Sequence, residues 1–365
     1  MNITFANLTA PNGAIKDLRQ LILQKLSTDP AFTLYAQIMG GVNNGDKLGV
    51  LSGFGYLGKE SAGCNPTYNN SLVATSEKTW DIATWEIAEK ICYSSLEGTI
   101  AQYLLKDHTD MDNLDGTYYI DNILMPFLQK AIYATIFRIV WFGDTSASVY
   151  DSVTNPTGSL AAGQDADFFD MTDGLWAQIF AGVSGGTISK TTITANTAAT
   201  FALQTSGIRT AGVAEALIDN AIDDAPAALR STMVEDQVIL VSQSLYDAAM
   251  RDVKNSNKGS ELQFDSWFTG IKATKWDGIT MIAMPMWDQI IKTSLNNVTY
   301  PAAAWDKPFR LVYTTKDNLI IGTRSKDLVE QIKYWFSEDD QDNKILVKDT
   351  LGALVANDNL IHVAY

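Results

Sequence analysis

The sequence predicts an α+β fold, and three segments indicate it. The longest stretch with helical spacing of apolar residues runs over 118–142 and ends at a Gly-Asp pair. Between 211 and 285, helix-type and strand-type stretches alternate, which is typical of a βαβ unit. The C-terminal segment 309–365 is dominated by runs of β-branched and aromatic residues, which favour strands. With 365 residues and 46% hydrophobic content, the chain can bury a sizeable core in one or two domains.

The N-terminal part of the sequence combines one helix with a long irregular segment. Apolar residues at positions 15, 18, 22 and 26 predict an amphipathic helix that ends before Pro30. From 32 to 76 no helical period is present: FTLYAQIM is strand-like, and many glycines follow it. So long an irregular segment is unusual in a compact domain unless it is functional or packs on another molecule. The sequence therefore predicts an extended loop over 32–76.

The central part predicts a strand, a long helix and then an α/β region. In 77–90, EKTWDIATWEIAEK alternates polar and apolar residues as a strand does, and helical spacing follows from Leu96. The long helix has Pro126 near its beginning and ends at Gly143, as helices commonly do. The Ser-, Thr- and Gly-rich segment 145–210 is interpreted as an insertion with one helix. After it we expect a helix over 211–224, a buried strand over 236–242, a helix over 243–255 and a strand over 278–285.

The C-terminal segment predicts a strand, a turn, a strand, an amphipathic helix, an acidic turn and two further strands. The helix is expected because Leu328, Ile332 and Trp335 recur at helical spacing, with Ser325 as its N-cap.

This order of elements resembles the closing segment of a known family. The phrase TTKDNLIIGTRSKDLVEQIKYWFSEDD, followed by KILVKDTLGALVANDNLIHVAY, is similar to the major capsid proteins of tailed bacteriophages with the Hong Kong 97 fold. The similarity is strongest to those of crAss-like and other phages of Bacteroidetes. It covers most of the chain and implies five parts: an N-terminal arm (1–31), an extended loop (32–76), a peripheral domain with a long spine helix (77–144), an axial domain with an insertion (145–324) and a return to the peripheral domain (325–365).

The resemblance implies a structural protein without enzymatic activity, cofactor or bound metal. Copies of the chain would assemble as hexamers and pentamers into the icosahedral head that encloses the double-stranded DNA genome of a tailed phage. The implied partners are other copies, scaffolding, portal and auxiliary capsid proteins, and DNA enclosed without sequence-specific binding. The protein would be a virion component that is assembled in the host cytoplasm. No long charged helical leader precedes Asn12, so either such a leader has been removed or a separate scaffold replaces it, and Met1 favours the scaffold. The tip of the extended loop, which would clasp a neighbour, is expected at Lys47, Gly53, Phe54, Gly55, Tyr56, Gly58 and Lys59.

Composition excludes several other classes. The formal net charge of −15 argues against tight sequence-independent binding of nucleic acid, which needs clustered basic residues. Two cysteines, Cys64 and Cys92, are too few for a disulfide framework or a zinc site. The apolar stretch 120–142 contains charged residues that a bilayer core would penalise, so no membrane partner is expected.

Two motifs suggest enzymes, but their contexts are wrong. The segment 53–58 fits the dinucleotide fingerprint G-x-G-x-x-G and, extended to Lys59, is close to a phosphate-binding loop. Glu60 stands where that loop needs Ser or Thr, and no helix follows. The segment 182–186 fits the nucleophile elbow around Ser184, with His362 downstream, yet a helix precedes it and a strand follows, the reverse of the required order. Two alternatives stay open: an encapsulin-type cellular compartment, which shares the capsid fold, and a serine hydrolase that uses Ser184.

Overall fold

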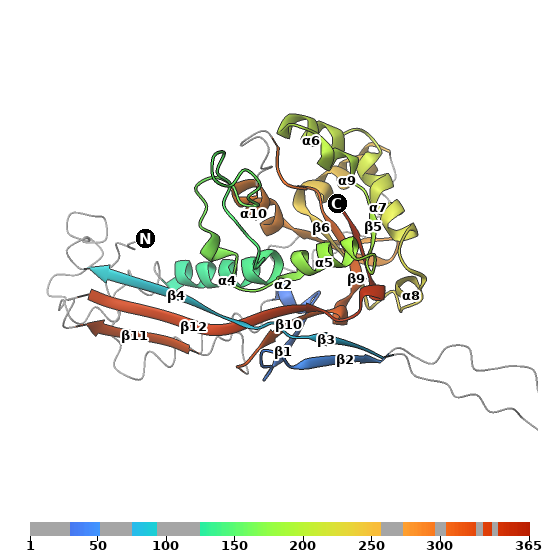
Figure 1. Cartoon of the computed structure of the whole chain (residues 1–365). Helices are drawn as coiled ribbons and strands as arrows, with labels where there is room; N and C mark the ends of the chain where they lie inside the picture. The colour runs from blue at the N-terminus through green and yellow to red at the C-terminus, as the bar shows by residue number, and fades with distance from the viewer. Residues whose placement is uncertain are drawn as a thin grey trace, which may run out of the picture.

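The computed structural model describes residues 30–51, 75–92, 125–256, 273–295, 304–325, 331–337 and 342–365. It has an α/β body built on a six-stranded sheet, and a second, five-stranded sheet that extends from the body as a long arm (Figure 1). A two-stranded hairpin extends in the opposite direction (Figure 1). The predicted α+β class is confirmed.

The six-stranded sheet forms the centre of the body. Its strand β6 (Gln237–Ser242) is parallel to β8 (Ile279–Met284), and helix α9 (Gln243–Asn255) follows β6 in the chain. This is the βαβ alternation that the sequence predicted. Every residue of β6 is buried, because helices cover both faces of the sheet. The full order is β5 (Ser189–Thr191), β13 (Ile361–Ala364), β9 (Leu311–Thr315), β6, β8 and β7 (Ala273–Trp276).

Two hydrophobic cores lie on opposite faces of this sheet. Val238 and Leu240 of β6 belong to the core that contains α5 (Leu175–Ser184) and α10 (Pro285–Ser294). Ile239 and Val241 belong to the core that contains α7 (Val213–Asp223) and α9. This alternation is the two-residue period of a strand. The shorter helices are α2 (Pro30–Thr33), α6 (Phe201–Ile208), α8 (Ala227–Arg230), η3 (Ala166–Phe168), η4 (Thr194–Thr197), η5 (Lys316–Asn318) and η6 (Asp358–Leu360).

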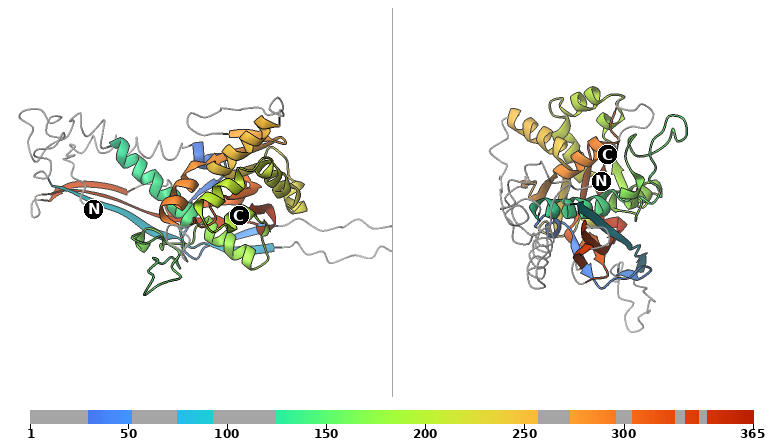
Figure 2. Two further views of the ribbon diagram at one scale, coloured as in Figure 1. Left: turned by 90° about the horizontal axis from the view of Figure 1, so that it is seen from above. Right: turned by 90° about the vertical axis from the view of Figure 1, so that its left-hand side faces the viewer.

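The arm is built around β12 (Asp342–Val355), the longest strand that the structure describes. Helix α4 (Met125–Phe142) lies along one face of the arm sheet, as the views in Figures 1 and 2 show. Ile132 and Ile136 of α4 share a core with Ile345 and Val347 of β12. The other strands of this sheet are β4 (Ala83–Cys92), β11 (Gln331–Ser337), β10 (Leu319–Thr323) and β1 (Gln37–Gly40).

The long helix ends where the sequence predicted, and its first expected residues, 118–124, lie outside the described part of the chain. The amide of Gly143 still donates to the Ile139 carbonyl at 3.1 Å, after which the chain turns away. The alternating segment 77–90 is confirmed as strand, since it enters β3 (Thr75–Thr79) and β4.

Two local predictions are wrong. The described part of the predicted C-terminal helix is the strand β11, which pairs antiparallel with β12 from Gln331 to Ser337, and residues 326–330 lie outside the described residues. The hydroxyl of Ser325, the predicted N-cap, donates to Asp349 at 2.8 Å. The run IKYWF has high strand propensity, and pairing with β12 decides in favour of the strand. The strand-like FTLYAQIM also begins differently, because α2 occupies its first two residues and only the end enters β1.

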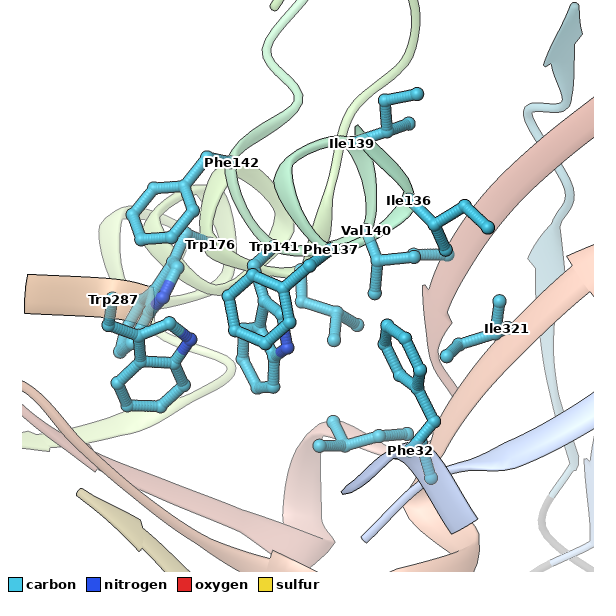
Figure 3. Close-up of a cluster of buried hydrophobic side chains, with 14 of the residues drawn as sticks. Phe32, Ile136, Phe137, Ile139, Val140, Trp141, Phe142, Trp176, Trp287 and Ile321 are labelled. Atoms are coloured by element: carbon cyan, nitrogen blue, oxygen red, sulfur yellow. The ribbon is translucent and has the colours of Figure 1, made fainter. Parts of the chain in front are cut away.

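Three tryptophans join the arm to the body. Trp141 comes from α4, Trp176 from α5 and Trp287 from α10 (Figure 3). The Trp287 ring lies 4.6 Å from that of Trp141 and 5.1 Å from that of Trp176, between centroids and in edge-to-face geometry. All three side chains are buried. This aromatic joint ties α4, which covers the arm sheet, to a helix that covers the body sheet.

Candidate functional site

The hairpin that leaves the body is firmly anchored. Its strands β2 (Lys47–Leu51) and β3 are antiparallel, with Lys47 opposite Thr79 and Leu51 opposite Thr75. At its base, the Trp80 amide donates to the Asp46 carbonyl at 2.9 Å, and Trp80 is buried in a small core together with residues of β10 and β12. The chain therefore leaves the hairpin at Leu51 and returns at Thr75, from a base attached to the five-stranded sheet.

Lys47 is the only member of the predicted loop tip within the described residues. It lies at the beginning of β2, at the anchored end of the hairpin. Its ammonium donates to Glu77 at 2.6 Å, and this pairing raises the pKa of Lys47 and lowers the pKa of Glu77. Both side chains are exposed, so the pair contributes little to stability. The other predicted residues lie outside the described part of the chain: Gly53, Phe54, Gly55, Tyr56, Gly58 and Lys59. The role of the loop tip in assembly stays a prediction.

The arm presents two long strand edges. β12 has β4 on one side and β11 with β10 on the other. Among the strands that the structure describes, neither β4, with ten residues, nor β11, with seven, has a second neighbour. An unpaired edge offers a row of N–H and C=O groups to another chain. The arm is thus suited to contact with a partner.

The structure does not assemble the hydrolase that the elbow motif suggested. Ser184 is the last residue of α5 and is exposed, and the Gly182 carbonyl accepts a hydrogen bond from the Thr187 amide in the turn that follows. A nucleophile elbow needs the serine between a strand and a following helix. His362 does not serve Ser184, because both of its ring nitrogens bond to other hydroxyls.

His362 belongs to a buried hydrogen-bond chain on β13. Its Nδ1 lies 2.6 Å from the Ser189 hydroxyl and its Nε2 lies 2.9 Å from the Thr191 hydroxyl, which donates to Asp224 at 2.9 Å. Since the single hydroxyl proton of Thr191 goes to that carboxylate, its oxygen accepts from Nε2–H. With its proton on Nε2, a neutral ring accepts at Nδ1 from Ser189, and the lowered pKa of His362 makes this the form present at neutral pH. Burial lowers the pKa of His362 to about 4, and the nearby charge of Asp224 opposes this effect.

The neutral state of His362 predicts a loss of stability in acid. Its pKa is about 4 in the folded chain and about 6.5 when unfolded, so the unfolded state binds more protons between these values. Full stability is expected above pH 6.5, and up to about 3 kcal/mol is lost as the pH falls toward 4. Urea unfolding of the wild type and of His362→Gln at pH 7.5 and 4.5 measures this. The variant should lose less stability than the wild type on acidification; an equal loss would refute a neutral buried His362.

The described residues contain neither a candidate metal site nor a candidate membrane-spanning helix. No cluster of three or more metal-binding side chains occurs there. In the same part of the chain, no helix is long and apolar enough to cross a membrane. Cys92 ends β4, whereas Cys64, His108 and the dinucleotide-like segment 53–58 lie outside the described residues.

One exposed aromatic residue was missed in the sequence. Trp335 was assigned to the apolar face of a helix, but on β11 its side chain is 41% exposed. The available signal was the alternation of Lys333 and Trp335, which puts both side chains on one face of a strand.

Comparison with known proteins gives similarity at the level of structure. No family model matches the sequence, and no curated protein matches it. Among solved structures, the chain is similar to a chain of the "Satellite phage P4 procapsid including size determination (Sid) protein". The two are 12% identical with a TM-score of 0.46, and the match covers 97% of this chain and 98% of that one. It is also similar to a chain of Gordonia phage Cozz (11% identity, TM-score 0.48, 93% and 85% covered) and to the capsid of Myoviridae phage XM1 (10% identity, TM-score 0.48, 93% and 91% covered).

Proposed function

We propose that this chain is the major capsid protein of a tailed bacteriophage, a structural subunit without enzymatic activity. The observation that carries the proposal is the pair of projections that leave the body in opposite directions, the arm and the anchored hairpin (Figure 1). Neither projection is covered completely by the described part of its own chain: the arm has two strand edges without a second neighbouring strand, and the hairpin extends away from the body. Neighbouring copies in a closed symmetric shell would cover such surfaces.

The mechanism is mechanical and needs no chemistry. Each copy would reach over its neighbours with the segment between Leu51 and Thr75 while its own arm is clasped in turn. Many modest contacts, each closed by symmetry, raise the overall avidity well above that of any single contact. The net charge of −15 suits a container wall that encloses DNA without adhering to it.

The finer assignments follow from the same proposal. The arm with α4 would correspond to the peripheral domain (77–144 and 325–365), apart from β13, which belongs to the body sheet. The six-stranded body would correspond to most of the axial domain (145–324), apart from β10, which belongs to the arm sheet. Residues 1–31 would form the N-terminal arm and 32–76 the extended loop with the tip described above. The partners would be other copies in hexamers and pentamers, scaffolding, portal and auxiliary proteins, and enclosed DNA. The amino-acid sequence of the segment 314–365 favours a phage of Bacteroidetes related to the crAss-like group. The head of this phage would be assembled in the host cytoplasm.

Electron microscopy tests the proposal. Negative-stain images of the purified chain, alone and co-expressed with its genomic neighbours, should show closed shells, tubes or rings of five and six copies. A monodisperse monomer under both conditions would refute a capsid role. Shells that contain a protein cargo and never DNA would instead indicate a cellular compartment.

A shortened hairpin tests whether the projection holds the shell together. Leu51 and Thr75 are directly opposite in the antiparallel register, so an Asn-Gly turn can replace residues 52–74 without disturbing β2 or β3. The variant is expected to melt at nearly the wild-type temperature, because the anchoring bonds of Trp80 are kept. Shells should be lost or should dissociate in dilute solution. Shells of wild-type stability would show that the segment does not clasp a neighbour.

A further inference from the structure

The strand β11 forms one edge of the arm sheet (Figure 1). Within the described part of the chain, it pairs with β12 on one side and with no strand on the other. A strand edge of this kind offers its backbone N–H and C=O groups to another chain. Which chain can pair with it depends on the side chains that the new register brings opposite one another. The edge sequence is QIKYWFS.

The face of β11 that points away from α4 carries a cation and a large aromatic ring. Tyr334 is opposite Ile345 of β12, which is buried in the core that also contains residues of α4. Lys333 and Trp335 flank Tyr334, so they lie on the other face of the sheet. Lys333 is exposed, and the Trp335 side chain is 41% exposed. The two residues therefore stand two positions apart on the outer face of an edge strand.

One antiparallel register pairs the whole of this edge with the same edge of a second copy. A twofold axis through Tyr334, perpendicular to the sheet, places Gln331 opposite the partner's Ser337 and pairs all seven residues. The outer faces of the two sheets then lie on the same side. An axis through Lys333 would pair fewer residues and would place two lysines opposite each other, which is unfavourable. An axis through Trp335 would also pair fewer residues.

In the complete register, the cation of each copy meets the aromatic ring of the other. Lys333 is opposite the partner's Trp335, and symmetry repeats this pair. An ammonium group is attracted to the face of an indole ring. Within its own sheet, Trp335 is opposite Lys344, so the ring lies between two lysines rather than beside an acid. A lysine at an edge often prevents strand pairing, whereas this register gives Lys333 a complementary neighbour.

The remaining pairs of the register are also favourable by residue type. At the axis, Tyr334 is opposite the partner's Tyr334, and Ile332 is opposite the partner's Phe336. Pairs of two aromatic residues, or of one aromatic and one β-branched residue, stabilise antiparallel sheets. The pair of Gln331 and Ser337 is uncharged. The edge is thus complementary to itself in one register, and no pair across the boundary joins like charges.

We propose that β11 of one copy pairs antiparallel with β11 of a second copy about a twofold axis at Tyr334, which joins their arm sheets into one continuous sheet. The inference rests on the proposed function, in which copies of the chain contact one another, and it names one of those contacts. The contact is isologous, so it joins copies two at a time. In a shell it would link one ring of copies to the next.

Disulfide cross-linking tests the register in the full chain. In a background of Cys64→Ser and Cys92→Ser, Tyr334→Cys places a thiol on the axis, directly opposite the same thiol of the partner. The matched control is Lys333→Cys, whose two thiols would be offset along the strands, with roughly 8 Å between Cα atoms and out of reach of a disulfide. Thermal melting checks that both variants fold. After mild oxidation, non-reducing electrophoresis should show about tenfold more covalent dimer for Tyr334→Cys than for the control.

An exchange of the two outer residues tests the pairing without cysteine chemistry. Trp335→Lys alone would place lysine opposite lysine twice, so association of the copies should weaken by roughly tenfold or more. Adding Lys333→Trp to that variant again places a lysine opposite a tryptophan in both pairs and should restore association. Sedimentation velocity and negative-stain imaging measure the fraction of chain in dimers and in shells.

The outcomes separate this contact from the capsid role. Normal shells in which folded Tyr334→Cys chains are cross-linked no more than the control would overturn the inference and leave the capsid role intact. Failure of the exchanged pair to recover association would also overturn the inference, and this result decides the question if Tyr334→Cys does not fold. Cross-linked dimers of a chain that never forms shells or rings would support the β11 contact and refute the proposed function.

Discussion

Replacing Trp287 with alanine should lower the free energy of unfolding by about 4 kcal/mol, the cost of deleting a large buried aromatic side chain. Trp287 contacts Trp141 of α4 and Trp176 of α5 in the aromatic joint (Figure 3). Its removal would leave a cavity between the helices that link the body to the arm. Chemical denaturation of the purified variant measures the loss.

Two further variants separate packing from the mere presence of tryptophan. Trp335→Ala removes the same type of side chain from an exposed position and should change stability by less than about 0.5 kcal/mol. Trp287→Phe keeps a ring in the joint and removes an indole N–H that is buried without a hydrogen-bond partner in the described structure. It should therefore cost clearly less than alanine. If Trp287→Ala were as mild as Trp335→Ala, the joint would not hold the two parts together.

Gly143→Ala should cost at least about 3 kcal/mol, because the added methyl group has no space. A Cβ at this position would lie 2.3 Å from the Thr172 carbonyl oxygen and 2.7 Å from the Ile139 carbonyl oxygen. Both are backbone atoms, so relief requires the end of α4 to move away from the segment that precedes α5 and the last turn of α4 to change its shape. That movement would break the bond from the Gly174 amide to the Gly143 carbonyl, now 2.9 Å long. Thermal and urea unfolding should both report the loss.

Gly49→Ala is the matched control for this substitution. A Cβ at Gly49 would meet no atom within 4 Å, and the residue has an ordinary backbone conformation on β2. Its stability should stay within about 0.5 kcal/mol of the wild type. A Gly143→Ala protein that unfolds at the wild-type denaturant concentration would show that the two helices can separate without cost.

Gly143 also shows which features the local sequence predicts and which it does not. A glycine after a long apolar period predicts the end of a helix, and the helix ends there. The residues around Gly143 give no sign that Thr172 and Gly174, about thirty positions away, approach its backbone too closely for any side chain. The local signal predicts the turn, and the tertiary contact explains why only glycine fits.

The wrong helix prediction at β11 also arises because a tertiary contact, absent from the local sequence, decides the structure. Leu328, Ile332 and Trp335 recur at helical spacing, while Ile332, Tyr334 and Phe336 recur at strand spacing, and both periods are present in one short segment. The choice depends on β12, which offers an edge to seven consecutive residues of β11. No window of sequence around 331–337 contains that edge, so the alternation of Lys333 and Trp335 does not by itself decide between strand and helix.

The sequence by itself determined the α+β class, the alternating elements of the body and the end of the long helix, because each depends on side-chain periodicity within a single segment. It also predicted correctly that a helix precedes Ser184 and a strand follows it, since that order is a local property. Only the tertiary structure decided which strands pair, which face of β12 receives α4, and which hydroxyls keep His362 neutral. These depend on residues far apart in the chain: Ser189 and His362 are separated by 173 positions, and no local preference brings two such side chains to 2.6 Å.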